Sequence, residues 1–207
     1  PNPNAPTGIL MPLSEIEDII AHNRDVIVVV DEAYIDFGGE SALPLIEKYD
    51  NLLVVQTFSK SRSLAGMRIG YVMGNEKLIR YLNDVKYSFN SYTMNQTALI
   101  LGAEAVKDRA YFEETCRKVI ETREWTKKEL HKLGFSFGDS KSNFIFAKHA
   151  SVPAEDIFEA LKKEEKAKTI TEDDAKDGLD QIQKLTDKKI NKIDELKAVK
   201  EKDVLEV

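Results

Sequence analysis

The chain has 207 residues, of which 42% are hydrophobic, so it can bury a core as one domain or as one domain with an appendage. Its net charge of -6 argues against a general DNA or RNA binder, because a protein that neutralises phosphates needs a basic surface. The single cysteine, Cys116, cannot form an internal disulfide, and no cysteine or histidine spacing indicates a metal site. We therefore expect a reducing, cytoplasmic compartment.

No apolar run approaches the roughly 20 residues that are needed to cross a bilayer, so no membrane partner is expected. The chain begins with Pro1 rather than methionine. The prolines and asparagines that follow resemble a turn cluster from the middle of a chain. We therefore expect a fragment of a longer protein.

The first 75 residues predict alternating strands and helices. Ser14 is placed to cap a short helix over 15–21, and a second helical stretch lies near 43–48. The β-branched run at 26–30 predicts a strand that is buried on both faces, as in a parallel sheet. The three predicted strands span 26–30, 52–57 and 69–73. This alternation is typical of an α/β fold.

Residues 76–133 predict mainly helix with an interruption near 89–94, and Cys116 falls on an apolar helical face that we expect in the core. Two short alternating runs then predict strands at 135–137 and 144–146. Pro153 begins a further helix that includes Phe158 and Leu161. These elements predict the start of a small α+β domain.

The composition changes after Phe158, because no aromatic residue follows and lysine, aspartate and glutamate dominate. Apolar residues recur at drifting helical spacing from Leu179 to Val199, which predicts a long amphipathic helix that needs a partner to cover its apolar side. We therefore predict three parts, which span residues 1–134, 135–163 and 164–207.

Several chemically useful side chains follow the predicted strands. Asp31 ends the first strand, where ligands bind in open α/β sheets, and Tyr34 comes three residues later. After the second strand come Thr57, Ser59 and Lys60, and Arg68 follows. An amine, a carboxylate and phosphate-binding donors are the groups that pyridoxal phosphate requires.

A magnesium site of a nucleotide hydrolase is the alternative interpretation of Asp31 and Glu32. That interpretation needs a glycine-rich phosphate loop with the Gly-x-x-x-x-Gly-Lys-Ser/Thr pattern, which the sequence lacks. Arg68 has a second interpretation as a structural salt-bridge partner, although its place beside two glycines favours an anion.

Three segments in order resemble fold-type I pyridoxal-phosphate-dependent aminotransferases. They are Pro3–Gly8, Val30–Tyr34 and Phe58–Gly70. Within that group, Asp31–Phe37 and Ser63–Tyr71 look most like histidinol-phosphate aminotransferase, and the resemblance covers about residues 1–163. It implies part of a large domain with a mixed, mostly parallel sheet and flanking helices.

The resemblance also implies a role for each candidate residue. Lys60 is the catalytic residue that holds pyridoxal phosphate covalently and then acts as the general base. The cofactor-binding positions are Asp31 on the pyridine nitrogen, Tyr34 on the ring hydroxyl, Thr57, Ser59 and Arg68 on the phosphate, and Asn4 in place of the family asparagine where Ala5 stands. The implied partners are an amino donor, a 2-oxo acid and a second copy of the chain.

The tail from about residue 165 resembles the C-terminal helix of ribosome recycling factor. The matching runs are Ile170–Asp174, Gln183–Asp187, Ile193–Leu196 and Lys202–Val207. This resemblance leaves two alternatives to an aminotransferase fragment: a translation protein that contacts the ribosome through its tail, and an inert chimeric fusion.

Overall fold

The computed structural model describes residues 1–167. The chain divides into two compact units, Pro1–Ala150 and a second unit that begins at Ser151. In the second unit the structure describes α5, Ala154–Ala167, which follows Pro153 as predicted. The predicted long tail helix lies outside the described residues.

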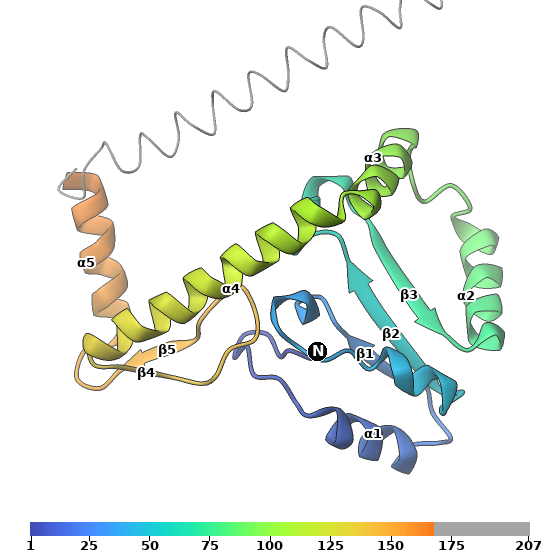
Figure 1. Ribbon diagram of the computed structural model, residues 1–207, viewed down its shortest axis with the longest axis horizontal. Coiled ribbons are helices and arrows are strands. Elements are labelled where there is room, and N and C mark those ends of the chain that lie inside the picture. The colour runs from blue at the N-terminus through green and yellow to red at the C-terminus, as the bar shows by residue number, and fades with distance from the viewer. Residues whose placement is uncertain (168–207) are drawn as a thin grey trace, which may run out of the picture. The chain divides into compact units, whose positions relative to one another are not determined.

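A three-stranded sheet lies at the centre of the first unit (Figure 1). Its strands are β1 (Val28–Asp31), β2 (Leu52–Thr57) and β3 (Gly70–Gly74). Strand β2 is the middle strand, and it pairs in parallel with β1 and antiparallel with β3. The mixed sheet with its surrounding helices confirms the predicted α/β fold class.

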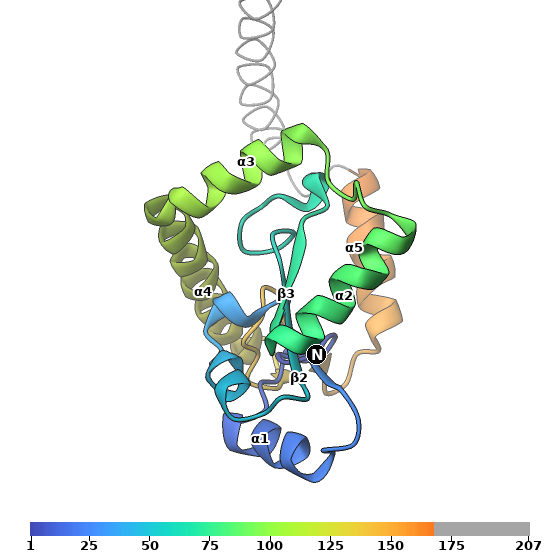
Figure 2. The same cartoon turned by 90° about the vertical axis from the view of Figure 1, so that its right-hand side faces the viewer.

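Helices surround this sheet. The α-helices of the first unit are α1 (Leu13–His22), α2 (Glu76–Phe89), α3 (Gln96–Lys107) and α4 (Arg109–Lys132). Short 3-10 helices occupy the connections: η1 (Ile35–Phe37), η2 (Leu43–Glu47) and η3 (Ala65–Met67). Figure 1 and Figure 2 place α2 and α4 on opposite sides of β3. Within residues 1–167 no helix has the length and apolar character that a bilayer span requires.

Polar side chains define where the later helices begin. Asn75 accepts a hydrogen bond from the Lys77 amide of α2 at 2.9 Å, and Asp108 accepts one from the Tyr111 amide of α4 at 3.1 Å. Helix α1 has no such cap, because Pro12 occupies the N-cap position and Ser14 already lies inside the helix. The predicted Ser14 cap is therefore wrong, although the helix itself is confirmed.

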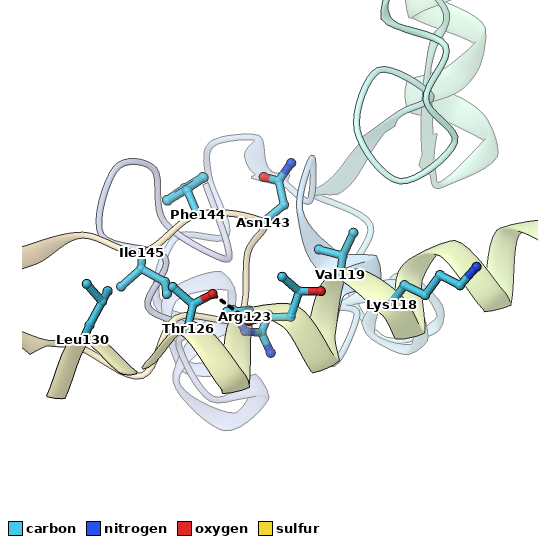
Figure 3. Close-up of a pocket in the computed structure, with 9 residues that line it drawn as sticks. Lys118, Val119, Arg123, Thr126, Leu130, Asn143, Phe144 and Ile145 are labelled. Atoms are coloured by element: carbon cyan, nitrogen blue, oxygen red, sulfur yellow. Dashed lines mark hydrogen bonds between the residues drawn. The ribbon is translucent and has the colours of Figure 1, made fainter. Parts of the chain in front are cut away.

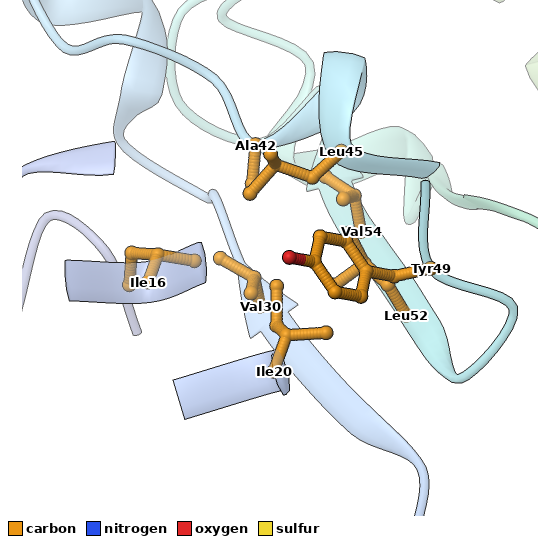
Figure 4. Close-up of a cluster of buried hydrophobic side chains, with 8 residues drawn as sticks. All are labelled: Ile16, Ile20, Val30, Ala42, Leu45, Tyr49, Leu52 and Val54. Atoms are coloured by element: carbon orange, nitrogen blue, oxygen red, sulfur yellow. The ribbon is translucent and has the colours of Figure 1, made fainter. Parts of the chain in front are cut away.

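The main core lies between α1, η2 and one face of the sheet. Ile20, Leu52 and Val54 are fully buried there, and Figure 4 shows the side chains of the cluster pointing toward one another. Burying an aliphatic side chain of this size contributes about 1.5–3 kcal/mol. This cluster therefore fixes α1 and η2 against β1 and β2. The predicted burial of Cys116 is also confirmed, on α4.

The prediction that the first strand is buried on both faces is wrong for this chain. Val30 is buried against α1, but Val29 on the opposite face is 55% exposed. The amide of Glu32 donates to Val55 of β2, and that of Val28 donates to Asn51, directly before β2, so the backbone groups of Val29 point to the other side of β1. Within residues 1–167 no strand pairs with that side. Strand β1 therefore has an open edge at Val29, while the Asp31 carbonyl on that side accepts a hydrogen bond from the Asn2 amide.

A two-stranded antiparallel sheet follows α4, formed by β4 (Phe135–Phe137) and β5 (Ala147–His149). The prediction of a strand at 144–146 is wrong, because the strand begins at Ala147. The carbonyl of Phe144 instead accepts a hydrogen bond from Ser140 at 2.6 Å, and its ring packs on Tyr34. The Phe144 carbonyl therefore bonds within its own loop rather than to a strand partner.

We expect Val29→Lys to reduce self-association through the open edge of β1, because a lysine on an edge strand opposes pairing with another chain. The free energy of unfolding should change by less than about 0.5 kcal/mol, since the Val29 side chain is exposed. Light scattering across a concentration series measures the association. The control is Val30→Lys, which places a charge in the core and should unfold the protein; equal association of Val29→Lys and the parent chain would contradict the prediction.

Candidate functional site

The sheet topology brings the predicted site residues to one edge. Strands β1 and β2 are parallel with Asp31 opposite Val55, so their carboxyl ends lie together. Thr57 at the end of β2 pairs with Gly70 at the start of β3, which places Arg68 just before that same edge. Ligands bind at such carboxyl ends in open α/β sheets. The candidate residues of the connection that leaves β1 and of the connection between β2 and β3 therefore meet there.

Lys60 and Tyr34 are in direct contact. The Lys60 Nζ atom lies 5.3 Å from the centroid of the Tyr34 ring, within the range of a cation–π interaction. Phe144 packs edge-on against the same ring, with 5.1 Å between centroids. Tyr34 is therefore held between the amine and an aromatic neighbour, while the Lys60 side chain stays exposed.

The hydroxyls of Thr57 and Ser59 lie 3.0 Å apart. The Ser59 amide donates to the Thr57 hydroxyl at 3.1 Å, and that hydroxyl also lies 3.1 Å from the carbonyl oxygen of Ile69. These contacts fix the first turn after β2 to the start of β3. The hydroxyls of Thr57 and Ser59, and the turn that they stabilise, thus lie directly before Lys60.

Arg68 adopts the left-handed conformation, with φ 56°, and its Nη1 donates to the Ala65 carbonyl at 3.1 Å. The residue is exposed. In the part of the chain that the structure describes, Arg68 forms no ion pair with a carboxylate. The guanidinium is therefore available to an anion, and the salt-bridge alternative gains no support.

The segment that carries Asn4 is joined to the end of β1, because the Asn2 amide donates to the Asp31 carbonyl at 2.8 Å. One Asp31 carboxylate oxygen accepts from the Ala33 amide at 3.0 Å, which orients the exposed side chain. The amide oxygen of Asn4 accepts from the Thr7 hydroxyl at 2.7 Å, so it closes its own turn. Only the Asn4 amide nitrogen is left to meet a ligand.

Glu32 differs sharply from its neighbour Asp31, because it is buried with 2% of its surface exposed. Its carboxylate accepts hydrogen bonds from Ser41 Oγ at 2.7 Å, the Ala42 amide at 2.6 Å and Gln56 Nε2 at 2.8 Å. Buried carboxylates need such partners. Glu32 therefore joins β1, β2 and the start of η2, and its carboxylate is already satisfied without a metal.

The Glu32 network continues to Tyr71, whose hydroxyl donates to Gln56 Oε1 at 2.6 Å. Burial raises the pKa of Tyr71, and the negative charge of Asp36 raises that pKa further. Tyr71 therefore keeps its proton and remains a donor to Gln56 at neutral pH. Local sequence patterns did not reveal this network, because its hydrogen bonds join residues 9 to 24 positions apart.

Arg123 is a second structural residue that the sequence did not reveal. Its guanidinium is buried and donates to the carbonyls of Phe37 at 2.7 Å and Ser142 at 3.0 Å. Its Nε atom donates to Glu124 at 2.9 Å. Arg123 thereby joins α4 to η1, which directly follows Tyr34, and to the loop that carries Phe144.

A cavity of about 620 Å³ lies beside α4 (Figure 3). The helix forms one wall, and the segment 143–145 forms the other. Its lining residues are Lys118, Val119, Thr122, Arg123, Thr126, Leu130, Asn143, Phe144 and Ile145. The cavity shares Phe144 with the surroundings of Tyr34, but none of the predicted cofactor residues lines it.

Comparison with protein families gives two matches. Residues 1–171 match the model of aminotransferase class I and II, and residues 153–205 match that of ribosome recycling factor. Among curated proteins, histidinol-phosphate aminotransferase from Brachyspira hyodysenteriae is 60% identical over 162 residues, which are 78% of this chain and 46% of that protein. The Lactococcus lactis subsp. cremoris enzyme is 56% identical, over 77% of this chain and 45% of its own length.

Two solved structures are similar to the chain. Histidinol-phosphate aminotransferase from Clostridium acetobutylicum has a TM-score of 0.71 at 27% identity, over 79% of this chain and 51% of that one. The Sinorhizobium meliloti enzyme, solved in complex with pyridoxal-5'-phosphate, has a TM-score of 0.65 at 25% identity, over 72% of this chain and 41% of that one. The chain thus spans just under half the length of the curated relatives it matches.

Substitution of the adjacent carboxylates Asp31 and Glu32 should change the free energy of unfolding by very different amounts. Glu32→Ala leaves the buried Ala42 amide and the half-buried Ser41 and Gln56 side chains without their acceptor, and it should lower the free energy of unfolding by about 1–3 kcal/mol. The matched variant Asp31→Asn alters an exposed side chain and should change that free energy by less than about 0.5 kcal/mol. Urea unfolding at pH 7 measures both. A large loss in Asp31→Asn, or none in Glu32→Ala, would contradict this assignment.

Proposed function

Because the chain belongs to the class I and II aminotransferase family, we propose that it forms part of an enzyme that carries out pyridoxal-phosphate-dependent transamination. The observation that carries the proposal is the contact of Lys60 with Tyr34 at the sheet edge where Asp31 also ends its strand. An amine, a phenol and a carboxylate gather there from two strand connections. Two hydroxyls and a guanidinium lie at the end of β2 and on the same connection as Lys60.

The residues present fit pyridoxal phosphate in their chemistry. Lys60 would hold the cofactor covalently, Asp31 would meet the pyridine nitrogen and Tyr34 the ring hydroxyl. Thr57, Ser59 and Arg68 would bind the phosphate, with the Asn4 amide nitrogen as a further donor to the ring hydroxyl. The exposed Asp31 and Arg68 side chains are free of ion pairs within residues 1–167, which supports roles in binding a ligand.

When bound, pyridoxal phosphate supplies an aldehyde for amines and a ring that draws electrons from the substrate α-carbon. Asp31 would keep the pyridine nitrogen protonated, since a carboxylate stabilises the adjacent cation. Lys60, once released by the incoming amine, would remove and return the proton at the α-carbon. Tyr34 would orient the ring through its hydroxyl while its own ring stays fixed by Phe144.

The substrates we propose are histidinol phosphate and 2-oxoglutarate, as in histidine biosynthesis. The names of the relatives support this assignment at 56–60% identity. A second copy of the chain is proposed as the partner, because enzymes of this type usually place their sites at a dimer interface. The chain covers 46% of the length of the Brachyspira hyodysenteriae enzyme.

Covalent labelling tests the proposal directly. The purified chain is mixed with pyridoxal phosphate, reduced with borohydride and mapped by peptide mass spectrometry. We expect the adduct to concentrate on Lys60, with Lys77, an exposed lysine on α2, as the internal reference. Asp31→Asn and Tyr34→Phe should each lower the Lys60 adduct roughly tenfold, equivalent to about 1.4 kcal/mol of binding.

Tyr34→Phe is the sharper of the two variants, because it removes the hydroxyl and keeps the ring that contacts Lys60 and Phe144. Lys60→Ala should abolish the specific adduct while the labelling of Lys77 stays unchanged. Equal labelling of Lys60 and Lys77 in the parent chain would overturn the proposed function.

We propose ribosome binding through residues 153–205 as a second candidate function, since this region matches ribosome recycling factor. Of this region the structure describes α5, which begins at Ala154 with Glu155 and Asp156 in its first turn, as expected for a stable helix start. Co-sedimentation of the full chain with ribosomes tests this function. Binding that disappears when the chain is cut after residue 150 would support it, and equal sedimentation with and without ribosomes would exclude it.

A further inference from the structure

The residue that follows Lys60 is held in the interior. Ser61 is 5% exposed, whereas Lys60 is exposed. The Ser61 hydroxyl donates a hydrogen bond to the Asp36 carboxylate, 25 positions earlier in the chain. Asp36 belongs to η1, which follows β1, so this contact joins the connections that leave β1 and β2.

Other contacts hold the backbone on both sides of Lys60. The Ser63 amide donates to the Lys60 carbonyl at 3.1 Å, and the Leu64 amide donates to the Phe58 carbonyl at 3.0 Å. Arg62 donates to the Ala105 carbonyl of α3 at 2.8 Å. The loop between β2 and β3, residues 58–69, is therefore fixed, and Ser61 links it to η1.

The η1 end of this link is equally well fixed. Ile35 and Phe37, on either side of Asp36, are 4% and 2% exposed. The Phe37 carbonyl accepts from the buried Arg123 at 2.7 Å. Tyr34, directly before η1, carries the ring under the Lys60 amine. The contact between Asp36 and Ser61 thus joins the two backbones that supply the amine and the phenol.

We propose that Asp36 is a positioning residue for Lys60 and acts through Ser61. This inference rests on the proposed function, in which Lys60 holds the cofactor. Asp36 accepts the Ser61 hydrogen bond and holds the Lys60 backbone at a fixed distance from Tyr34. The contact needs an acceptor at position 36 and a donor at position 61, so the amide oxygen of an asparagine can replace the carboxylate but an alanine cannot.

Hydrogen exchange tests the Asp36–Ser61 contact, which we call the tether, in the absence of the cofactor. The amides of Ser59, Ser63 and Leu64 donate within the loop and report its opening. We expect Asp36→Ala and Ser61→Ala to raise their exchange about tenfold, as fits the loss of one hydrogen bond to a charged group. Asp36→Asn should restore most of the protection. The matched control is Asp84→Ala, at an exposed aspartate of α2.

Selective labelling then tests the effect on Lys60. In Asp36→Ala the pyridoxal phosphate adduct at Lys60, relative to that at Lys77, should fall about tenfold. Asp36→Asn should recover it, and the double variant Asp36→Ala with Ser61→Ala should lose no more than either single variant. A general loss of structure would instead accelerate exchange along the whole chain and would not be rescued by asparagine.

Two outcomes separate this inference from the proposed function. If the parent chain labels Lys60 selectively while Asp36→Ala changes neither loop exchange nor the adduct ratio, the tether is overturned and the proposed function stands. If the parent chain shows no selective adduct, the proposed function fails together with the positioning role that rests on it. The exchange data then still report whether the Asp36–Ser61 contact holds the loop.

Discussion

The parallel pairing of β1 with β2 is the constraint on which the candidate site depends. It sets Asp31 opposite Val55, so the connections that leave both strands start from the same edge. The antiparallel pairing of β3 brings its first residue, Gly70, opposite Thr57, so the connection between β2 and β3 begins and ends at this edge. Buried Glu32 reinforces the pairing, because its carboxylate accepts hydrogen bonds from β2 and from the residues that begin η2. Without this ladder the amine, phenol and carboxylate would belong to unrelated loops.

Residues with opposite environments alternate along the site. Exposed Asp31 precedes buried Glu32, and exposed Lys60 precedes buried Ser61. In both pairs the buried member has hydrogen-bond partners from distant parts of the chain, which hold the backbone in place. A binding group attached to a fixed backbone loses less conformational entropy when a ligand arrives. Structural and binding roles are thus divided between neighbouring residues.

Strand β1 has the composition of an interior strand, although it lies at an edge of the sheet within residues 1–167. The curated relatives are about twice as long as the region they share with this chain. Val29 is exposed on the sheet face opposite α1, and its backbone groups point away from β2. In a parallel sheet such a strand is normally buried on both faces. The β-branched composition of β1 therefore fits an interior strand better than the edge position it holds within residues 1–167.

The sequence by itself determined the family and the order of the elements. The spacing of hydrophobic residues, the polar residues that follow the strands and the motif around Lys60 are all local features. It also placed Asp31, Tyr34 and Lys60 correctly relative to their strands. It misplaced the strand near residue 144, since the local pattern could not include the packing of Phe144 on Tyr34. It also misplaced the cap of α1, where Pro12, a local signal, occupies the N-cap position in place of Ser14. Only the tertiary structure decided which carboxylate is buried, that Arg123 joins α4 to η1, and that Asp36 meets Ser61. Those contacts join residues 9 to 86 positions apart, and no local spacing encodes a contact that the packing of separate elements creates.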